Sequence, residues 1–229
     1  MVAFLGFQDE GVSKKMARAL RIGIGCVIGG WLLAACGGNA SGPTVKALET
    51  VEVREYQGQK LSSIDDFQEN SISGPKTVSL DGYHLDITGL VDKPLALTYD
   101  QVLAHAQYSK VVTLNCVEGW SVTILWEGVL IDDLLKEAKA KDSALIAIFH
   151  AVDGYTSSLT LDFIRQNKIM LAYKMNGVTI PTERGFPFMV VAESKSGYKW
   201  VKWVVGIELS DNLNYRGFWE SQGYNNDGT

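Results

Sequence analysis

The sequence is poor in the residues that most often mark a metal or redox centre. Its 229 residues include three cysteines and three histidines. No cysteines have the CxxC or CxxCH spacing and no histidines are paired at a zinc-ligand spacing, which argues against a zinc site and excludes a covalent haem. A P-loop and a GxGxxG following a strand are also missing, so the common nucleotide-binding loops are excluded.

Basic residues are outnumbered by acidic ones. The chain holds 21 lysines and arginines against 26 aspartates and glutamates, a formal charge of −5. If residues 1–35 are removed, four basic and two acidic residues go with them, which leaves 17 against 24 and a charge of −7. Nucleic-acid binding depends on basic contacts to phosphates, so this balance argues against a nucleic-acid partner.

The first 35 residues have the layout of a lipoprotein signal peptide. A basic stretch, Lys14–Arg21, precedes an apolar run, Ile22–Leu33, and small residues then lead to Cys36. The run is shorter than the roughly 20 residues that span a membrane, which disfavours a transmembrane anchor. We therefore predict an exported, membrane-anchored lipoprotein that faces the periplasm or the cell exterior, with Cys36 acylated.

The folded part of the chain is left with a single thiol. We expect residues 36–61 to form a tether and N-terminal extension, and residues 62–229 to form the domain. Cys26 leaves with the signal and Cys36 carries lipid, so Cys116 has no partner for an internal disulfide. An unpaired thiol in an exported protein is either a reactive group or a small buried hydrophobe, and spacing alone does not decide between them.

Short strand-like segments outnumber helical patterns. The pair Asn176-Gly177 suits a type I′ hairpin turn, and Thr98 suits the N-cap of a short helix. Strands are expected at residues 83–88, 111–114, 145–149, 170–175, 178–180, 188–192 and 199–209, and helices at 98–105, 130–138 and 161–165. This mixture predicts an α+β fold with a mixed or antiparallel, β-rich core and short helices.

The last predicted strand bears on function. Alternation along residues 199–209 places Val201 and Trp203 on a core face, and Trp200 and Lys202 on the opposite face. The second face is therefore either exposed to solvent or part of a binding site.

Two regions concentrate residues that can carry chemistry. The loop at residues 115–121 mounts Cys116 at a predicted strand end, beside glycine and tryptophan, where functional groups are often found. A thiolate there suits a soft metal, or nucleophilic catalysis if a histidine (His84, His105 or His150) lies close. The second region, residues 184–187 with 197–202, can grip a phosphate or a polar ring; its alternative is a solvated strand face.

At these segments the sequence resembles the sulfite-oxidase-type molybdopterin-dependent oxidoreductases. The similarity runs from about Ser62 to Thr229. Its five segments follow the family's order and are specific only together: ITGLVDKPLALTYDQVL, VVTLNCVEGW, AVDGYTSSLTL, LAYKMNG and GYKWVKWVVGIEL. The sequence looks most like the catalytic subunits of bacterial periplasmic methionine sulfoxide reductases and related single-domain proteins. The resemblance implies the sulfite-oxidase molybdopterin-binding fold and a molybdenum–molybdopterin cofactor.

The resemblance also implies roles for individual residues. Cys116 would be the thiolate ligand of molybdenum. The residues expected to contact the pterin or its phosphate are Asn70, Ser71, Ile72, His150, Arg184, Lys199, Trp200 and Lys202. From loop position, we expect the substrate approach to be lined by Glu118, Trp120, Trp126 and Tyr155.

The implied activity is two-electron, oxygen-atom-transfer chemistry on a small-molecule or sulfoxide-like substrate. Because the sequence has no haem motif, a separate membrane or soluble cytochrome would exchange the electrons, and the lipid anchor would hold the domain near a membrane partner. The arginines and tyrosine with which sulfite oxidases bind sulfite have no matching motif, so sulfite is a poor candidate. Two alternatives stay open: a cysteine-nucleophile hydrolase or transpeptidase, and a non-enzymatic ligand-binding lipoprotein.

Overall fold

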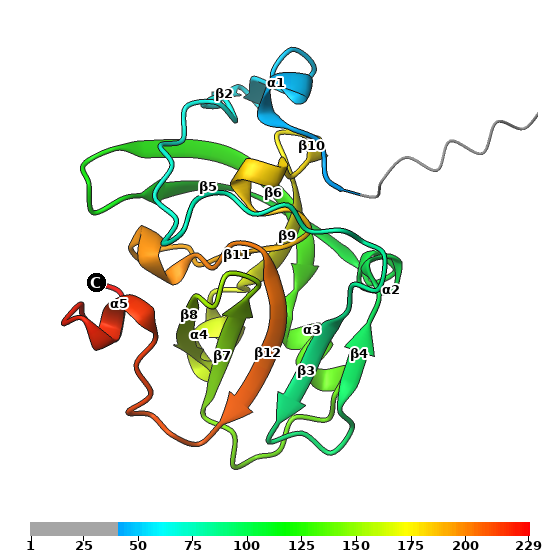
Figure 1. The fold of residues 1–229 in the computed structure, drawn as a ribbon, viewed down its shortest axis with the longest axis vertical. Coiled ribbons are helices and arrows are strands. Elements are labelled where there is room, and N and C mark those ends of the chain that lie inside the picture. Colours follow the sequence, from blue (N-terminus) through cyan, green and yellow to red (C-terminus); the bar gives the residue numbers. More distant parts are fainter. Residues whose placement is uncertain (1–40) are drawn as a thin grey trace, which may run out of the picture. The chain divides into compact units, whose positions relative to one another are not determined.

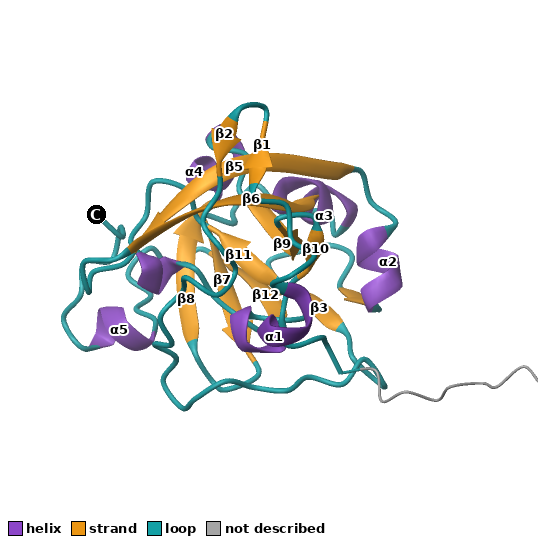
Figure 2. Ribbon diagram, turned by 90° about the horizontal axis from the view of Figure 1, so that it is seen from above, coloured by secondary structure: helices purple, strands orange, loops and turns teal. Residues whose placement is uncertain are grey.

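Two five-stranded sheets form the framework of residues 41–229, the part of the chain that this computed structural model describes (Figures 1 and 2). The predicted signal peptide, Cys36 and the start of the tether lie outside the described residues. A two-stranded hairpin, β1 (Glu55–Tyr56) and β2 (Gln59–Lys60), adds to the N-terminal part. Among the described residues, no helix is both long enough and apolar enough to cross a membrane.

The first sheet is antiparallel and carries the longest strands. Its strands are β5 (Gln107–Asn115), β6 (Ser121–Leu130), β9 (Met170–Met175), β10 (Val178–Thr179) and β11 (Met189–Val191). Strands β5 and β6 form a hairpin in register from Gln107↔Val129 to Asn115↔Ser121. The β9–β10 turn is made by Asn176 and Gly177 with φ angles of 48° and 77°, the positive values of a type I′ turn. The hairpin predicted from this Asn-Gly pair is confirmed.

The second sheet is mixed. Its order is β4 (Leu95–Leu97), β3 (Leu85–Gly89), β12 (Val204–Ser210), β7 (Ile146–Ala151) and β8 (Thr156–Thr160). Strands β3 and β12 pair in parallel, and the other neighbours pair antiparallel. Together with the first sheet, this confirms the predicted α+β fold with a mixed and antiparallel β-rich core.

The helices are short and cover the sheets locally. They are α1 (Val45–Leu48), α2 (Tyr99–Leu103), α3 (Ile131–Glu137), α4 (Leu161–Gln166) and α5 (Phe218–Ser221), with 3-10 turns at Thr182–Arg184 and Gly197–Lys199. Thr98 caps α2 in a capping box with Gln101: the Gln101 N–H donates to Thr98 Oγ1, and the Gln101 side chain accepts from the Thr98 N–H. The α3 helix buries Ile131, Leu134 and Leu135, as its apolar spacing predicts.

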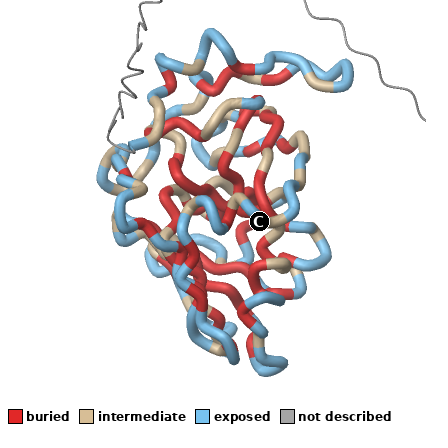
Figure 3. The backbone as a smooth tube through the Cα atoms, turned by 90° about the vertical axis from the view of Figure 1, so that its right-hand side faces the viewer, coloured by how far each residue is buried: buried red, intermediate tan, exposed pale blue. Residues whose placement is uncertain are grey.

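One continuous hydrophobic core joins both sheets. Its largest fully buried side chains include Trp126, Trp203, Phe149 and Phe188. Figure 3 shows the buried backbone segments running through the interior, with exposed segments at the loops. A core of this size is what orders the loops that carry function.

The strand predicted at residues 199–209 is wrong in its first half. Strand β12 begins only at Val204, and residues before it form the 3-10 turn Gly197–Lys199 and an irregular link. Trp203 has a φ angle of +52°, which breaks the alternation of side chains along an extended chain. The Trp203 indole N–H donates to the Thr182 carbonyl at 2.8 Å, and this bond holds the irregular link against the turn Thr182–Arg184.

Candidate active site

Cys116 lies in the tight loop that joins β5 to β6. Its backbone N–H donates to the Trp120 carbonyl at 2.9 Å, and its own carbonyl accepts from the Gly119 N–H at 3.1 Å. Gly119 closes this turn with a φ angle of +87°, a conformation that favours glycine. The hairpin therefore holds the Cys116 side chain at a fixed place, at the end of the predicted strand.

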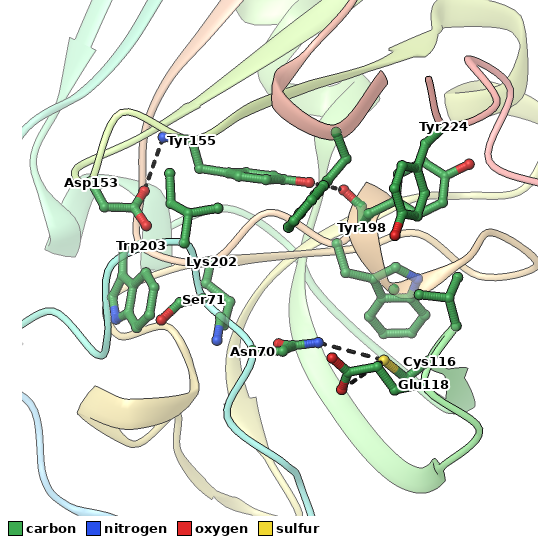
Figure 4. A pocket seen from close by; sticks show the side chains of 15 residues that line it. Asn70, Ser71, Cys116, Glu118, Asp153, Tyr155, Tyr198, Lys202, Trp203 and Tyr224 are labelled. Atoms are coloured by element: carbon green, nitrogen blue, oxygen red, sulfur yellow. Dashed lines mark hydrogen bonds between the residues drawn. The ribbon is translucent and has the colours of Figure 1, made fainter. Parts of the chain in front are cut away.

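A segment from the N-terminal part of the domain crosses in front of this loop. The Asn70 side-chain amide approaches Cys116 Sγ at 3.5 Å, so that an N–H can be donated to the sulfur. The Glu118 carboxylate also approaches the sulfur, at 3.9 Å from Sγ, and accepts from the Trp120 indole N–H at 3.2 Å. Figure 4 draws the contacts of Asn70 and Glu118 with the sulfur. The thiol is thus flanked by a donor amide and by a carboxylate.

Cys116 opens onto a cavity of about 740 Å³, part of it open to solvent, which we call the Cys116 cavity. A recess lined by aromatic side chains with a few polar groups is the usual kind of site for a small molecule or cofactor. Its lining residues are Asn70, Ser71, Ile72, Cys116, Val117, Glu118, Asp153, Tyr155, Gly197, Tyr198, Trp200, Lys202, Trp203, Trp219 and Tyr224. Figure 4 shows Tyr155, Tyr198 and Tyr224 along one side, with Asn70, Glu118 and Cys116 gathered below them.

A second cavity of about 380 Å³ adjoins the first and shares Asn70, Gly197, Trp200 and Lys202 with it. It also carries Arg184. Two neighbouring cavities with shared walls can accommodate one elongated ligand that reaches from the thiol to the basic side chains.

Two cations with long ion pairs line these cavities: Lys202 lines both, and Arg184 lines the second. The Lys202 ammonium is 17% exposed and lies 3.5 Å from Glu69 and 4.6 Å above the Trp203 ring. The Arg184 guanidinium is 11% exposed; its Nε donates to the Ile64 carbonyl at 2.9 Å, and its ion pair with Asp65 is long, at 3.9 Å. Cations so loosely paired in a recess can take up an anionic group.

The pKa values of these groups follow their surroundings. Burial lowers the pKa of both Lys202 and Arg184, and the nearby Arg184 charge lowers that of Lys202 further. Burial alone would raise the pKa of Glu69, but hydrogen bonds from Ser71 and the charge of Lys202 lower it. Glu69 therefore stays ionised. Lys202 and Arg184 share this one carboxylate, and a bound phosphate group would reduce the repulsion between the two cations.

The structure brings most of the predicted site residues together. Among the expected pterin contacts, the residues that line the Cys116 cavity are Asn70, Ser71, Ile72, Trp200 and Lys202, and Arg184 lines the adjoining one. Of the residues expected along the substrate approach, Glu118 and Tyr155 line the Cys116 cavity, Trp120 lines the second cavity, and Trp126 is fully buried. Trp200 and Lys202 reach the cavity from an irregular link and not from one face of a strand.

Two predicted residues are placed elsewhere. Lys199 is fully buried and donates from Nζ to Glu220 at 2.6 Å and to the Ser158 carbonyl at 3.1 Å. His150 lies on β7, where its Nε2 is 3.0 Å from the Glu208 carboxylate, and it does not line either cavity. No local pattern predicts these partners, because Glu220 lies 21 positions from Lys199 and Glu208 lies 58 positions from His150.

Tyr198 belongs to the predicted region 197–202, but the sequence does not single out several other residues of the cavity wall: Asp153, Trp203, Trp219 and Tyr224. The alternation predicts a core position for Trp203, and its side chain is only 1% exposed. Its ring nevertheless forms part of the cavity wall. Trp219 and Tyr224 belong to a C-terminal segment with no recognisable motif. Only the concentration of aromatic residues between positions 215 and 224 could have drawn attention to it.

The donor set fits a metal that brings its own ligands. Within residues 41–229, no three His, Cys, Asp or Glu side chains cluster closely enough to hold a metal ion by themselves. Cys116 is the free cysteine of this part of the chain, and it is only partly buried. One soft thiolate, an adjoining cavity with aromatic walls and a basic recess for an anion together suit a metal carried by a phosphorylated, sulfur-bearing organic cofactor.

Comparison with known proteins gives the class. Residues 72–219 match the family model described as the oxidoreductase molybdopterin binding domain. The sulfane dehydrogenase SoxCD of Paracoccus pantotrophus has the same fold, with a TM-score of 0.60 and 22% identity over 71% of this chain and 50% of that one. The chain belongs to the family of molybdopterin-binding oxidoreductases, of the sulfite-oxidase type. It is an oxidoreductase, and its cofactor is molybdenum–molybdopterin.

Individual relatives are similar over the same region. The uncharacterized oxidoreductase YuiH of Bacillus subtilis is 36% identical over 143 residues, which are 62% of this chain and 72% of that protein. The protein-methionine-sulfoxide reductase catalytic subunit MsrP of Gluconobacter oxydans is 32% identical over 146 residues, 56% of this chain. The match covers 47% of MsrP, about half of its length.

Proposed function

We propose that this protein reduces a sulfoxide to a sulfide at a molybdenum centre ligated by the Cys116 thiolate. Similarity to MsrP proteins, named as methionine-sulfoxide reductases, supports the substrate class. The observation that carries the proposal is the position of Cys116, a thiol held at the edge of a cavity whose far end is basic. The balanced reaction takes a sulfoxide, two electrons and two protons to a sulfide and water.

The bound cofactor would supply a metal that changes its oxidation state by two electrons and accepts the oxygen atom. Cys116 would hold the metal, and the Asn70 amide would donate to the sulfur and stabilise its negative charge. Lys202 and Arg184 would bind the cofactor's phosphate or polar rim, and Trp200 would pack beside it. The pterin contacts proposed from Ser71 and Ile72 belong to the same segment as Asn70.

The residues around Cys116 also exclude water and hold protons. Burial raises the pKa of Tyr155, so its hydroxyl keeps its proton and donates to the Tyr198 carbonyl. This bond ties the segment with Tyr198 and Trp200 to the loop after β7. Glu118 lies closest to the thiol among the carboxylates of the cavity and would accept or release protons beside the substrate.

The remaining roles concern electrons and location. We propose that a separate membrane or soluble cytochrome delivers the electrons, since no haem motif occurs in the sequence.

We also propose that the protein is exported and carries a lipid attached at Cys36. Labelling with a radioactive fatty acid tests the anchor: Cys36→Ala should abolish the label and release the protein from the membrane fraction. A labelled Cys36→Ala protein would contradict it.

The reaction is tested with cofactor-loaded protein, a reduced viologen as electron donor and methionine sulfoxide as substrate. Wild-type protein should form methionine, and Cys116→Ser should lose at least about a hundredfold in kcat, the scale of losing a group that holds the reacting metal. Ser121→Ala, at the other end of the same loop, is the matched control and should retain turnover. Full turnover by Cys116→Ser would contradict the proposal.

The cysteine-nucleophile alternative gains no support from the geometry. A hydrolase of this kind needs a histidine within hydrogen-bond reach of the thiol. The described hydrogen-bond partners of Cys116 Sγ are Asn70 and Glu118, and no histidine lines its cavity.

A further inference from the structure

The C-terminal segment of the chain builds one wall of the Cys116 cavity. Trp219 in α5 and Tyr224 just after it both line the cavity, although they lie more than a hundred positions from Cys116. The family model matches residues 72–219, so Tyr224 falls beyond the matched region.

A buried ion pair fixes the segment in place. The Glu220 carboxylate is fully buried and accepts from Lys199 Nζ at 2.6 Å and from Ser157 Oγ at 2.5 Å. Further along, the Tyr198 hydroxyl donates to the Asn225 carbonyl at 2.7 Å, and the Ser196 N–H donates to the Gly228 carbonyl at 2.8 Å. Because both ends are bound, Trp219 and Tyr224 are held at the cavity before any ligand arrives.

The wall is aromatic. The Tyr224 ring centre lies 5.2 Å from that of Tyr198 and 5.3 Å from that of Trp219, in tilted or edge-on contact. Tyr198 and Tyr224 are seen side by side in Figure 4. Aromatic rings in such contact present electron-rich faces and rigid apolar surface to a ligand.

The cation against this wall is paired, and carboxylates line the rest of the cavity: Lys199 Nζ lies 5.9 Å from the centre of the Tyr198 ring but is bound to Glu220 at 2.6 Å. Glu118 and Asp153 line the same cavity, and each has a carboxylate oxygen without a hydrogen-bond partner among the described residues. The cation of the cavity, Lys202, lies 3.5 Å from Glu69 and is the side chain proposed to bind the cofactor's phosphate or polar rim. Rings together with carboxylates attract a cation and repel an anion.

We propose that Tyr198, Trp219 and Tyr224 bind a cationic group on the substrate. The preferred substrate is then a sulfoxide that carries an ammonium or methylated ammonium group on an arm long enough to reach from the metal to this wall. Anionic sulfoxides are disfavoured. The inference rests on the proposed sulfoxide reduction for the identity of the substrate, but the cation site can be measured without turnover.

The kinetic test uses three methyl sulfoxides of equal arm length that end in trimethylammonium, tert-butyl or carboxylate. With wild-type protein, kcat/KM should fall in that order, with the cationic arm about tenfold above the neutral one, as expected of a cation–aromatic contact. Tyr224→Leu should remove most of that ratio, chiefly through KM, whereas Tyr224→Phe should keep it. Tyr224 is 38% exposed, so neither change removes a core residue.

The binding test separates this inference from the proposed reaction. Choline and its uncharged isostere 3,3-dimethylbutan-1-ol are titrated by calorimetry into cofactor-loaded protein. Choline should bind about tenfold more tightly, and Tyr224→Leu should abolish the difference. If choline is preferred but no sulfoxide is reduced, the proposed reaction fails and the cation site stands. Equal affinity of the two compounds, or a preference unchanged in Tyr224→Leu, overturns the cation site.

Discussion

Cys116 shows how far a single residue can be understood before its neighbours are known. Its isolation in the sequence made it the candidate for chemistry, and its place after a strand put it in a loop. Its flanking groups could not be foreseen, because Asn70 reaches the sulfur from 46 positions away. The position of a thiol in the sequence predicts that it lies in a loop, whereas contacts across the fold determine its partners.

The structure predicts how Cys116 responds to an alkylating reagent. The thiol borders an open cavity and is partly buried, so iodoacetamide should label it in cofactor-free protein. A bound cofactor would occupy the same space and use the sulfur as a ligand, so labelling should slow at least about tenfold after loading. Peptide mass spectrometry measures the labelled fraction.

Equal labelling rates before and after loading would contradict the placement of the cofactor beside this thiol. The same comparison on denatured protein is the control, because loading cannot protect an unfolded chain.

At the scale of elements, local signals predicted the structure best where one short motif was sufficient. The Asn-Gly turn and the Thr98 cap each act within four residues, and both are present. The strand expected at residues 199–203 failed because the tertiary bonds of Trp203, to Gly185 and Thr182, override the local pattern. The site depends on that irregular link, which alternation could not reveal.

Helices α3 and α4 are linked by an acid-sensitive contact. Asp132 in α3 pairs with Lys136 at 2.9 Å and with Arg165 of α4 at 3.1 Å. Burial alone would raise its pKa, but the hydrogen bonds and charges of these two cations lower it below 3.8. A carboxylate with a lowered folded-state pKa stabilises the fold above its unfolded-state pKa, and this stability is lost as the pH falls through the folded-state value.

Asp132→Asn should therefore lower the free energy of unfolding at pH 7, by about 1 kcal/mol for a partly exposed pair. The deficit relative to wild type should shrink as the pH falls below 3.8, where Asp132 of the unfolded wild-type chain becomes protonated, and should vanish below the lower folded-state pKa. Urea unfolding at pH 7 and pH 3 measures this deficit.

Asp133→Asn is the control, since Asp133 is more exposed and pairs with Lys136 alone among the described residues. A deficit for Asp132→Asn that stays constant with pH would contradict the assignment.

At the scale of the whole domain, the site is assembled from distant parts of the chain. The N-terminal segment supplies Asn70, the β5–β6 loop supplies Cys116, and the C-terminal segment supplies Trp219 and Tyr224. The family resemblance in the sequence identified Asn70 and Cys116 as candidate site residues. The C-terminal wall escaped it because its position depends on Glu220 and Lys199, a buried pair that no local pattern reveals.

The buried pair Lys199–Glu220 should therefore be important for stability as well as for the wall. Burial lowers the pKa of Lys199, because the interior of the protein disfavours a charged ammonium. The hydrogen bond and the charge of Glu220 act in the opposite direction and stabilise the charged form. Lys199→Met leaves the Glu220 carboxylate buried without its cation and should cost about 3–5 kcal/mol.

The double variant Lys199→Met/Glu220→Leu should recover at least about half of that loss, because a buried pair is often replaceable by apolar groups. Thermal unfolding of both variants measures the coupling. A single variant as stable as wild type, or a double variant no better than the single, would contradict the role of the pair.

The proposed bond between Cys116 and molybdenum is tested most directly by X-ray absorption at the molybdenum edge, on loaded wild-type protein and on loaded Cys116→Ser. The account predicts that the number of sulfur neighbours of molybdenum falls by one in the variant while the cofactor's own sulfurs stay. The same sulfur count in both proteins would contradict it.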